Sequence, residues 1–202
     1  MNTSATHETS DVRRKILETG RRIMAGKGYS GVGLNEILTA SGVPKGSFYH
    51  WFASKDAFGE ALLDHYFTDY LAEVDELLSA ADQTMAQRLI RYWTQWEENQ
   101  SVLECQGKCL AVKLGAEVAD FSDAMRAALD RGTSRIVRRI ADTIEAGVAE
   151  GSLSVQADAR VIAESLYEMW LGASVMAKIV RNKKPFRNAM IATQLLLGLA
   201  GK

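Results

Sequence analysis

The sequence predicts an all-α protein in which a three-helix N-terminal head precedes a larger helical bundle. Only two prolines, Pro44 and Pro185, occur in 202 residues, so long stretches can form helices. Apolar residues recur at helical spacing along most of the chain, and no alternating pattern typical of strands competes with them. Hydrophobic residues make up 47% of the chain, enough for a sizeable core, which excludes a wholly disordered protein.

The head is predicted to span residues 11–54, behind a polar, disordered tail at residues 1–10. A helical pattern opens the head, and a glycine-rich stretch ends that pattern. A short helix comes next, from about Leu34 to Ala40, then a tight Ser-Gly-Val-Pro turn at 41–44, then a very short helix from Lys45 to about Phe52. Two short helices joined by a tight turn behind a supporting helix form a helix-turn-helix pattern.

Residues 55–202 are predicted to form the helical body. Ser54 has the position of an N-cap for a long helix that runs to about Ser79, with Asp56 in its first turn. Gly151-Ser152 and the Asn-Lys-Lys-Pro stretch at 182–185 are the clearest breaks in the rest of the body. The further helical segments are predicted at 82–100, 105–118, 122–150, 157–181 and 186–200.

The charge is distributed unevenly between head and body. Residues 1–55 carry eight Lys and Arg against four Asp and Glu, whereas the rest of the chain carries sixteen against twenty-one. A basic head on an acidic body suits a head that meets phosphate groups. No apolar run approaches the roughly 20 residues that span a bilayer, and no signal-peptide pattern opens the chain, so a cytoplasmic protein is expected.

The second short helix of the head carries residues suited to DNA contact. Lys45, Gly46 and Ser47 open the helix, and the small side chains there let the backbone approach DNA closely. Tyr49 and His50 face outward and offer a phenol and an imidazole to phosphates or base edges.

The same helix is expected to be anchored from behind by aromatic residues. Phe48 and Phe52 lie four residues apart and can pack toward the preceding short helix. Lys55, at the start of the next helix, combines its charge with free backbone N–H groups, a combination that suits a phosphate. The alternative is that Phe48, Trp51 and Phe52 are core aromatics of an ordinary bundle and that His50 is a surface histidine.

The stretch GYSGVGLNEILTASGVPKGSFYHWFASKDAF resembles the DNA-binding signature of TetR-family regulators nearly end to end. The resemblance implies a fold of about nine helices, a homodimer formed through the last two long helices, and transcriptional repression by operator binding. The sequence leaves the operator, the target genes and the choice between repressor and activator open. By the resemblance, the residues that contact DNA are Lys45, Gly46, Ser47, Tyr49, His50 and Lys55.

The last two helical segments are apolar over wide faces, so they must be buried on more than one side. Packing within the chain or a two-fold interface between two copies would each explain this pattern. A dimer would place two reading helices about 34–36 Å apart, which predicts a palindromic operator. The predicted interface residues are Leu166, Trp170, Met190 and Leu195.

Cys109 lies one residue after Lys108 and four before Lys113. Nearby ammonium groups favour the thiolate form and so raise the reactivity of a thiol at neutral pH. A second thiol, Cys105, lies four residues earlier, where a disulfide within one helix would have poor geometry. The alternative is that Cys109 is an ordinary small core residue.

The runs KCLAVKLGAEVADFSDAMR and LYEMWLGASVMAKIVR resemble the matching regions of TetR-family repressors that respond to reactive electrophiles. The resemblance implies that Cys109 is the sensor and that Lys178 lies beside it. The residues just before the cysteine depart from that pattern, which leaves the role of Cys105 open. A lysine near a helix end, as Lys178 is, also commonly just reaches solvent.

Other functions remain as alternatives. A small apolar inducer could bind reversibly inside the bundle, in a pocket lined by Tyr70, Tyr92, Trp93, Trp96 and Trp170, although these aromatics could equally be plain core. A helical adaptor without a DNA role is the alternative from another class. No motif of nucleotide binding, zinc hydrolysis or a nucleophile elbow occurs, so the chain is predicted not to be an enzyme. Two cysteines and three scattered histidines predict no metal site, and no cofactor is expected.

Overall fold

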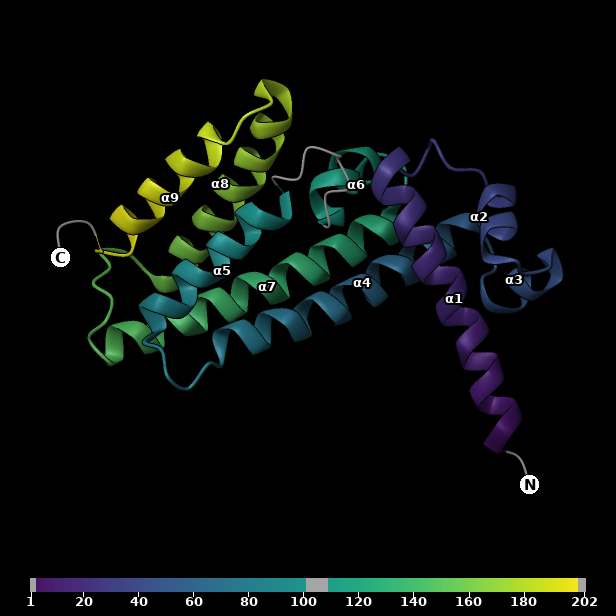
Figure 1. Ribbon diagram of the computed structural model, residues 1–202, viewed down its shortest axis with the longest axis horizontal. Coiled ribbons are helices and arrows are strands. Elements are labelled where there is room, and N and C mark those ends of the chain that lie inside the picture. The colour runs from purple at the N-terminus through teal and green to yellow at the C-terminus, as the bar shows by residue number, and fades with distance from the viewer. Residues whose placement is uncertain (1–2, 101–108, 200–202) are drawn as a thin grey trace. The chain divides into compact units, whose positions relative to one another are not determined.

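The structure, a computed structural model, describes residues 3–100 and 109–199 and contains nine α-helices and no strand within them (Figure 1). The prediction of an all-helical fold is therefore confirmed. The helices are α1 (Thr3–Lys27), α2 (Leu34–Ser41), α3 (Lys45–Trp51), α4 (Lys55–Leu78), α5 (Met85–Gln100), α6 (Leu110–Ala119), α7 (Asp123–Ala149), α8 (Ala159–Val180) and α9 (Lys184–Leu196).

The chain divides into two compact units. The first comprises Met1–Thr68 and Cys109–Gly132, and the second comprises Asp69–Lys108 and Thr133–Lys202. The helices α4 and α7 contribute residues to both units, whereas α6 belongs to the first unit together with α1, α2 and α3. This division differs from the predicted boundary after residue 54, because the head shares its unit with segments that come much later in the sequence.

The helix boundaries differ from the predicted ones mainly at α1 and α6. Helix α1 begins at Thr3, so residues 3–10, which composition predicted as a tail, form its first turns. No proline or glycine occurs in that stretch to stop a helix. Helix α6 begins at Leu110, and residues 105–108 of the predicted segment lie outside the described residues. Ser54 caps α4 as predicted, because its hydroxyl accepts a hydrogen bond from the N–H of Ala57 at 3.0 Å.

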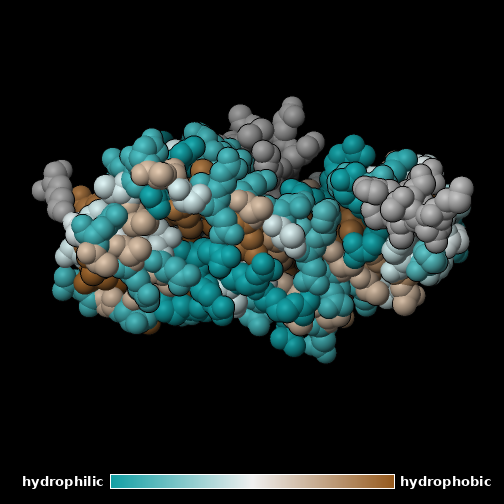
Figure 2. Space-filling model, turned by 90° about the horizontal axis from the view of Figure 1, so that it is seen from below, coloured by the Kyte–Doolittle hydropathy of each residue, from teal (hydrophilic) through white to brown (hydrophobic). Residues whose placement is uncertain are grey.

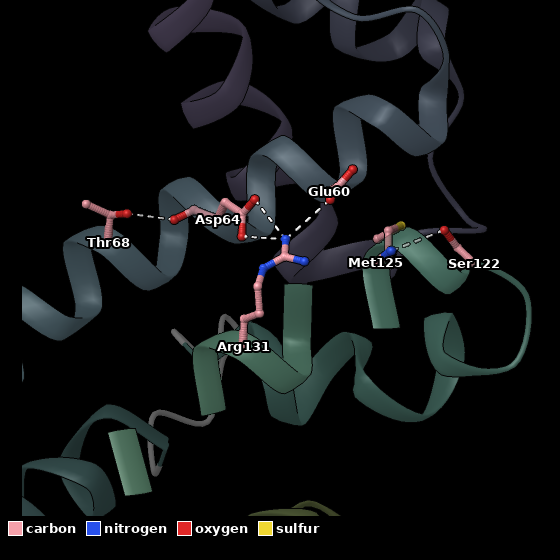
Figure 3. A network of polar contacts seen from close by, with 6 residues as sticks. All are labelled: Glu60, Asp64, Thr68, Ser122, Met125 and Arg131. Carbon is pink, nitrogen blue, oxygen red and sulfur yellow. Dashed lines mark hydrogen bonds and ion pairs between the residues drawn. The ribbon is translucent and has the colours of Figure 1, made fainter. Parts of the chain in front are cut away.

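In the first unit, Arg131 of α7 reaches across to α4 (Figure 3). Its guanidinium donates to both carboxylate oxygens of Asp64 at 3.1 Å and to Glu60 at 3.3 Å. The three side chains are exposed, so the contacts contribute little to stability. Their geometry fixes the register of the two helices instead, because a planar guanidinium that forks onto one carboxylate leaves little freedom to slide.

In the second unit, α8 and α9 lie side by side (Figure 1). Indole rings join these two helices to α5. Trp93 of α5 stacks on Trp170 of α8 with ring centroids 4.9 Å apart, and both are fully buried. The indole N–H of Trp170 donates to Thr193 of α9 at 3.0 Å, and that of Trp96 donates to Ser174 of α8 at 2.9 Å. Hydroxyl acceptors therefore let three helices share a core of large polar-tipped aromatics.

Hydrophilic residues predominate on the face shown in Figure 2, with separate hydrophobic patches among them. Within the part of the chain that the structure describes, no helix is long and apolar enough to cross a membrane.

Candidate nucleic-acid interface and sensor region

The turn between α2 and α3 depends on the conformation of Gly42. Its φ of 63° lies in the left-handed region, which glycine adopts without a side-chain penalty. The N–H groups of Gly42 and Val43 donate back to the carbonyls of Thr39 and Leu38, so two carbonyls of the last turn of α2 are satisfied. Pro44 then serves as the N-cap of α3, and the chain enters the second helix after a sharp change of direction.

The predicted DNA-contact residues of α3 lie on its solvent-facing part. Lys45, Gly46 and His50 are exposed, Ser47 is partly exposed, and Tyr49 is 49% exposed. The ammonium of Lys45 lies 5.9 Å from the centre of the Tyr49 ring. The structure thus brings these five predicted residues together on one short helix that is open to solvent.

Aromatic packing holds α3 from behind. Phe48 is fully buried and Phe52 nearly so, as predicted. Their rings lie 5.1 Å apart, and each lies within 5.4 Å of the ring of Phe58 at the start of α4. Arg13 of α1 lies over Phe52 at 5.6 Å. Because this cluster pins one side of α3, the polar side has to face outward.

Lys55 has a contact that the sequence did not predict. Its ammonium donates to the carbonyl of Tyr29 at 2.9 Å and lies 4.2 Å from the centre of the Tyr29 ring. Burial lowers the pKa of Lys55, although the carboxylates of Asp56 and Glu117 oppose that effect. The charge of Lys55 is thus held against the chain, and its contact with DNA stays a prediction.

Tyr29 itself is a buried junction between elements. Its hydroxyl donates to Asp56 of α4 at 2.6 Å, and its ring stacks on Phe121, just after α6, at 5.6 Å. Burial and the bond to Asp56 raise the pKa of Tyr29 well above its ordinary value of 10. Sequence reasoning did not select Tyr29, although the Gly-Tyr pair at the start of the signature stretch was the available signal.

Glu117 of α6 is a second residue that sequence reasoning missed. Its two carboxylate oxygens accept hydrogen bonds from the backbone N–H groups of Tyr29 at 3.0 Å and Ser30 at 2.6 Å. Partial burial raises the pKa of Glu117, but these bonds and the charge of Lys113 outweigh it, so the pKa lies below 4.5. No local pattern in the sequence points to this contact, because Glu117 lies almost ninety residues after Tyr29 and Ser30.

Cys109 is buried, with 5% of its surface exposed, and is the N-cap of α6. Its carbonyl accepts a hydrogen bond from the N–H of Lys113 at 3.3 Å, so Lys113 lies one turn along the helix. Cys105 and Lys108 lie outside the described residues. Lys178 is partly exposed in the last turn of α8 and belongs to the second unit, whereas Cys109 belongs to the first.

Three of the five predicted pocket residues line one small cavity in the described part of the chain. Tyr70, Tyr92 and Trp96 line a cavity of about 20 Å³ between α4 and α5, and the hydroxyls of Tyr70 and Tyr92 lie 3.3 Å apart there. Trp93 and Trp170 are not part of the lining of this cavity, and their rings stack on each other in the core. A volume of this size holds about one water molecule.

The predicted dimer residues divide into buried and exposed ones. Leu166 and Trp170 are fully buried in the core of the chain, and Met190 is partly exposed. Leu195 is 62% exposed. Apart from Val161 near the start of α8, the large apolar side chains that α8 and α9 expose form what we call the α8–α9 apolar surface: Val175, Met176, Ile179, Val180, Ile191, Leu195 and Leu196.

Metal-binding residues are not clustered in the described ranges. Among residues 3–100 and 109–199, no three or more His, Cys, Asp or Glu side chains are grouped so that they could hold a metal ion.

Two family models match the chain. The model described as "Bacterial regulatory proteins, tetR family" matches residues 16–62, which contain the helix-turn-helix, and "Tetracyclin repressor-like, C-terminal domain" matches residues 86–193. The chain belongs to the TetR family. This assignment confirms the predicted family and a DNA-binding transcriptional regulator that is not an enzyme.

Individual TetR-family proteins are similar over nearly the whole chain. The HTH-type transcriptional repressor NemR of Escherichia coli K12 is 36% identical over 184 residues, which cover 91% of this chain and 92% of NemR. The transcriptional regulator AcuR of Cereibacter sphaeroides is 33% identical over 90% of this chain and 83% of its own. The crystal structure of the reduced form of E. coli NemR matches with a TM-score of 0.88 over 95% of this chain and 100% of that one.

Proposed function

We propose that this TetR-family regulator is a homodimeric repressor that leaves a palindromic operator when a reactive electrophile or an oxidant modifies Cys109. The observation that carries the DNA-binding part is the exposed polar side of α3 above its buried phenylalanines. The proposed site of action is the cytoplasm, because the operator lies there.

The DNA contacts would come from the first turns of α3 in the major groove. Gly46 and Ser47 let the backbone approach closely, whereas Lys45 supplies charge for a phosphate. Tyr49 and His50 are the exposed side chains with donors and acceptors for base edges or phosphates. The NemR similarity supports repression as the sign of regulation.

The homodimer would use the α8–α9 apolar surface. Seven large apolar side chains exposed on two adjacent helices would be unfavourable in water, and a two-fold contact with a second copy would cover them. Two copies of α3 can then reach successive major grooves on one side of the duplex. This symmetry leads to a palindromic operator.

The sensing step would take place at Cys109. A helix N-terminus stabilises negative charge, so the N-cap position of Cys109 favours the reactive thiolate. Cys109 is almost completely enclosed, so an added group would find no space without displacing the start of α6. Lys178 is proposed as the ammonium that supports the thiolate or its oxidised form, on the strength of the sequence resemblance alone.

The test is operator binding by the purified, reduced protein, measured by fluorescence anisotropy with duplex DNA from just upstream of its own coding region. Each protein is titrated before and after treatment with stoichiometric N-ethylmaleimide. The variants are Cys109→Ser and Cys105→Ser, which remove one thiol each. We expect tight, salt-sensitive binding that the reagent abolishes in the wild type and in Cys105→Ser but not in Cys109→Ser.

Two other results would redirect the proposal. Binding that survives the reagent in the wild type would retain the regulator and reject the cysteine switch, in favour of a reversibly bound small molecule. Failure to bind both this fragment and a randomised duplex pool would reject DNA binding and favour a helical adaptor.

A further inference from the structure

The turn after α1 is held by a residue from a distant part of the chain. Gly28, Tyr29 and Ser30 come directly after the end of α1, and the N–H groups of the last two converge on the carboxylate of Glu117. Consecutive backbone N–H groups that converge in this way form a concave anion site. Here the anion is the protein's own side chain.

Gly28 shows how closely the carboxylate approaches. Its φ is +81°, and a Cβ built at this position would lie 2.7 Å from Oε2 of Glu117. A side chain would therefore be strained by the backbone conformation and would also collide with the carboxylate. The turn is shaped to receive Glu117.

A short series of contacts leads from Glu117 to the DNA-reading helix. The residue that Glu117 holds, Tyr29, donates to Asp56 through its hydroxyl and accepts from Lys55 through its carbonyl. Lys55 and Asp56 are the first two residues of α4, and only residues 52–54 separate them from α3. The orientation of α3 therefore depends on the position of Tyr29.

The same helix begins at the thiol. Cys109 is the N-cap of α6, and Glu117 lies two turns further along. Phe121, just beyond the end of α6, adds a second contact because its ring stacks on Tyr29. A shift of α6 along its axis thus moves both groups that hold Tyr29, since a helix transmits displacement as a nearly rigid rod.

We propose that Glu117 is a positioning residue of the DNA-binding head, through which α6 controls the orientation of α3. In the unmodified protein the carboxylate holds the Tyr29–Ser30 turn, and through Lys55 and Asp56 it holds the start of α4 in the DNA-binding orientation. A change at the N-terminus of α6 reaches the head by moving or breaking this contact. The readout of this inference rests on the proposed function, because it requires operator binding.

The test uses Glu117→Gln and Glu117→Ala in the full-length protein. Gln keeps the size of the side chain but removes its charge and turns an NH₂ group toward one backbone N–H, whereas Ala removes the contact entirely. Asp120→Asn and Asp120→Ala are the matched controls, because Asp120 is an acid at the end of the same helix. Operator affinity is measured with and without N-ethylmaleimide, and amide hydrogen exchange is followed at Tyr29 and Ser30.

We expect faster exchange at Tyr29 and Ser30 in both Glu117 variants, and an operator affinity about tenfold weaker than that of the wild type. The ratio of dissociation constants with and without the reagent, about 5- to 150-fold or more in the wild type, should fall toward one. A merely structural role would weaken both states equally and leave the ratio unchanged. The Asp120 controls should match the wild type in all three measurements.

Wild-type affinity and ratio in a folded Glu117→Gln protein would overturn the inference while leaving the proposed function intact. If the reagent leaves wild-type binding unchanged, only the cysteine switch is rejected. Weaker binding with faster exchange confined to Tyr29 and Ser30 would then still support the positioning role, and unchanged binding would reject it. If the wild type binds no DNA, the proposed function and the inference fail together. Circular dichroism identifies a variant that fails to fold, in which case Glu117→Gln replaces Glu117→Ala.

Discussion

The exposed fraction of each side chain on α3 indicates whether it supports the fold or is available to DNA. Phe48, with no exposed surface, decides which way the helix faces, and Lys45 and Tyr49 then project into solvent. A substitution on the inner side should therefore damage folding, and one on the outer side should damage DNA binding alone.

For Lys45→Ala we expect operator affinity to fall roughly tenfold and the slope of log Kd against log salt concentration to shrink by about one, because one phosphate contact is lost. The thermal unfolding midpoint should not change, since the side chain is exposed. Anisotropy titrations at several salt concentrations measure the slope. Lys183→Ala, at an exposed position before α9, serves as the control, and an unchanged slope for Lys45→Ala would contradict the phosphate contact.

The carboxylate of Glu117 should also make stability depend on pH. Because its pKa in the folded protein is below the ordinary 4.5, the charged form stabilises the fold at pH values above 4.5. That contribution is lost as the pH falls through the lowered pKa. Urea unfolding should therefore show Glu117→Gln about 1–2 kcal/mol less stable than the wild type at pH 7, allowing for partial exposure. A difference that does not shrink at any pH as the pH is lowered from 7 would show that the charge is not responsible.

At the scale of helices, periodicity in the sequence predicted every described element but not every boundary. The apolar spacing marks a helix because it marks a buried face, whereas an end depends on caps that distant residues supply. The N–H of Met85 at the start of α5, for example, donates to the carboxylate of Glu150, 65 residues later. Such a cap cannot be recognised before the fold is known.

In the candidate site, too, the sequence predicted some residues and not others. The grouping of the predicted DNA-contact residues on the exposed side of α3 was predictable because they are contiguous and belong to one signature stretch. Glu117 was not, since its partners are far away in the sequence. Leu166 and Trp170 illustrate a third case: both belong to wide apolar faces, and periodicity could not tell the side that packs within the chain from the side left exposed.

The buried hydrogen bond between Trp170 of α8 and Thr193 of α9 should contribute to the stability of the fold. Thr193→Val keeps the shape of the side chain but leaves the buried indole N–H of Trp170 without its acceptor. We expect a loss of about 1–3 kcal/mol in the free energy of unfolding, measured by chemical denaturation. Thr94→Val, at an exposed position on α5, should change stability by less than about 0.5 kcal/mol. Equal changes in the free energy of unfolding at the two sites would mean that the hydrogen bond from Trp170 to Thr193 does not stabilise the fold.

At the scale of the whole molecule, the α8–α9 apolar surface is the feature that a second copy should cover. Ile179→Glu and Leu195→Glu place charges where the proposed interface is apolar, at side chains that are 66% and 62% exposed. We expect monomers in sedimentation velocity, together with weaker operator binding because two half-sites can no longer be gripped at once. Val148→Glu, at an exposed position on α7, should remain dimeric. Dimers of all three variants would place the interface elsewhere.

The discontinuity of the first compact unit has a consequence for the nascent chain. Tyr29 leaves the ribosome first, and Glu117, its partner in the turn, is synthesised 88 positions later. At about 5–20 residues per second, roughly 4–18 seconds pass between the two. During that interval the helix-turn-helix is complete in sequence, but the turn behind it lacks its anion. A newly made head therefore acquires its operator-binding geometry only after α6 has emerged, which delays DNA binding until the helix that controls it is already in place.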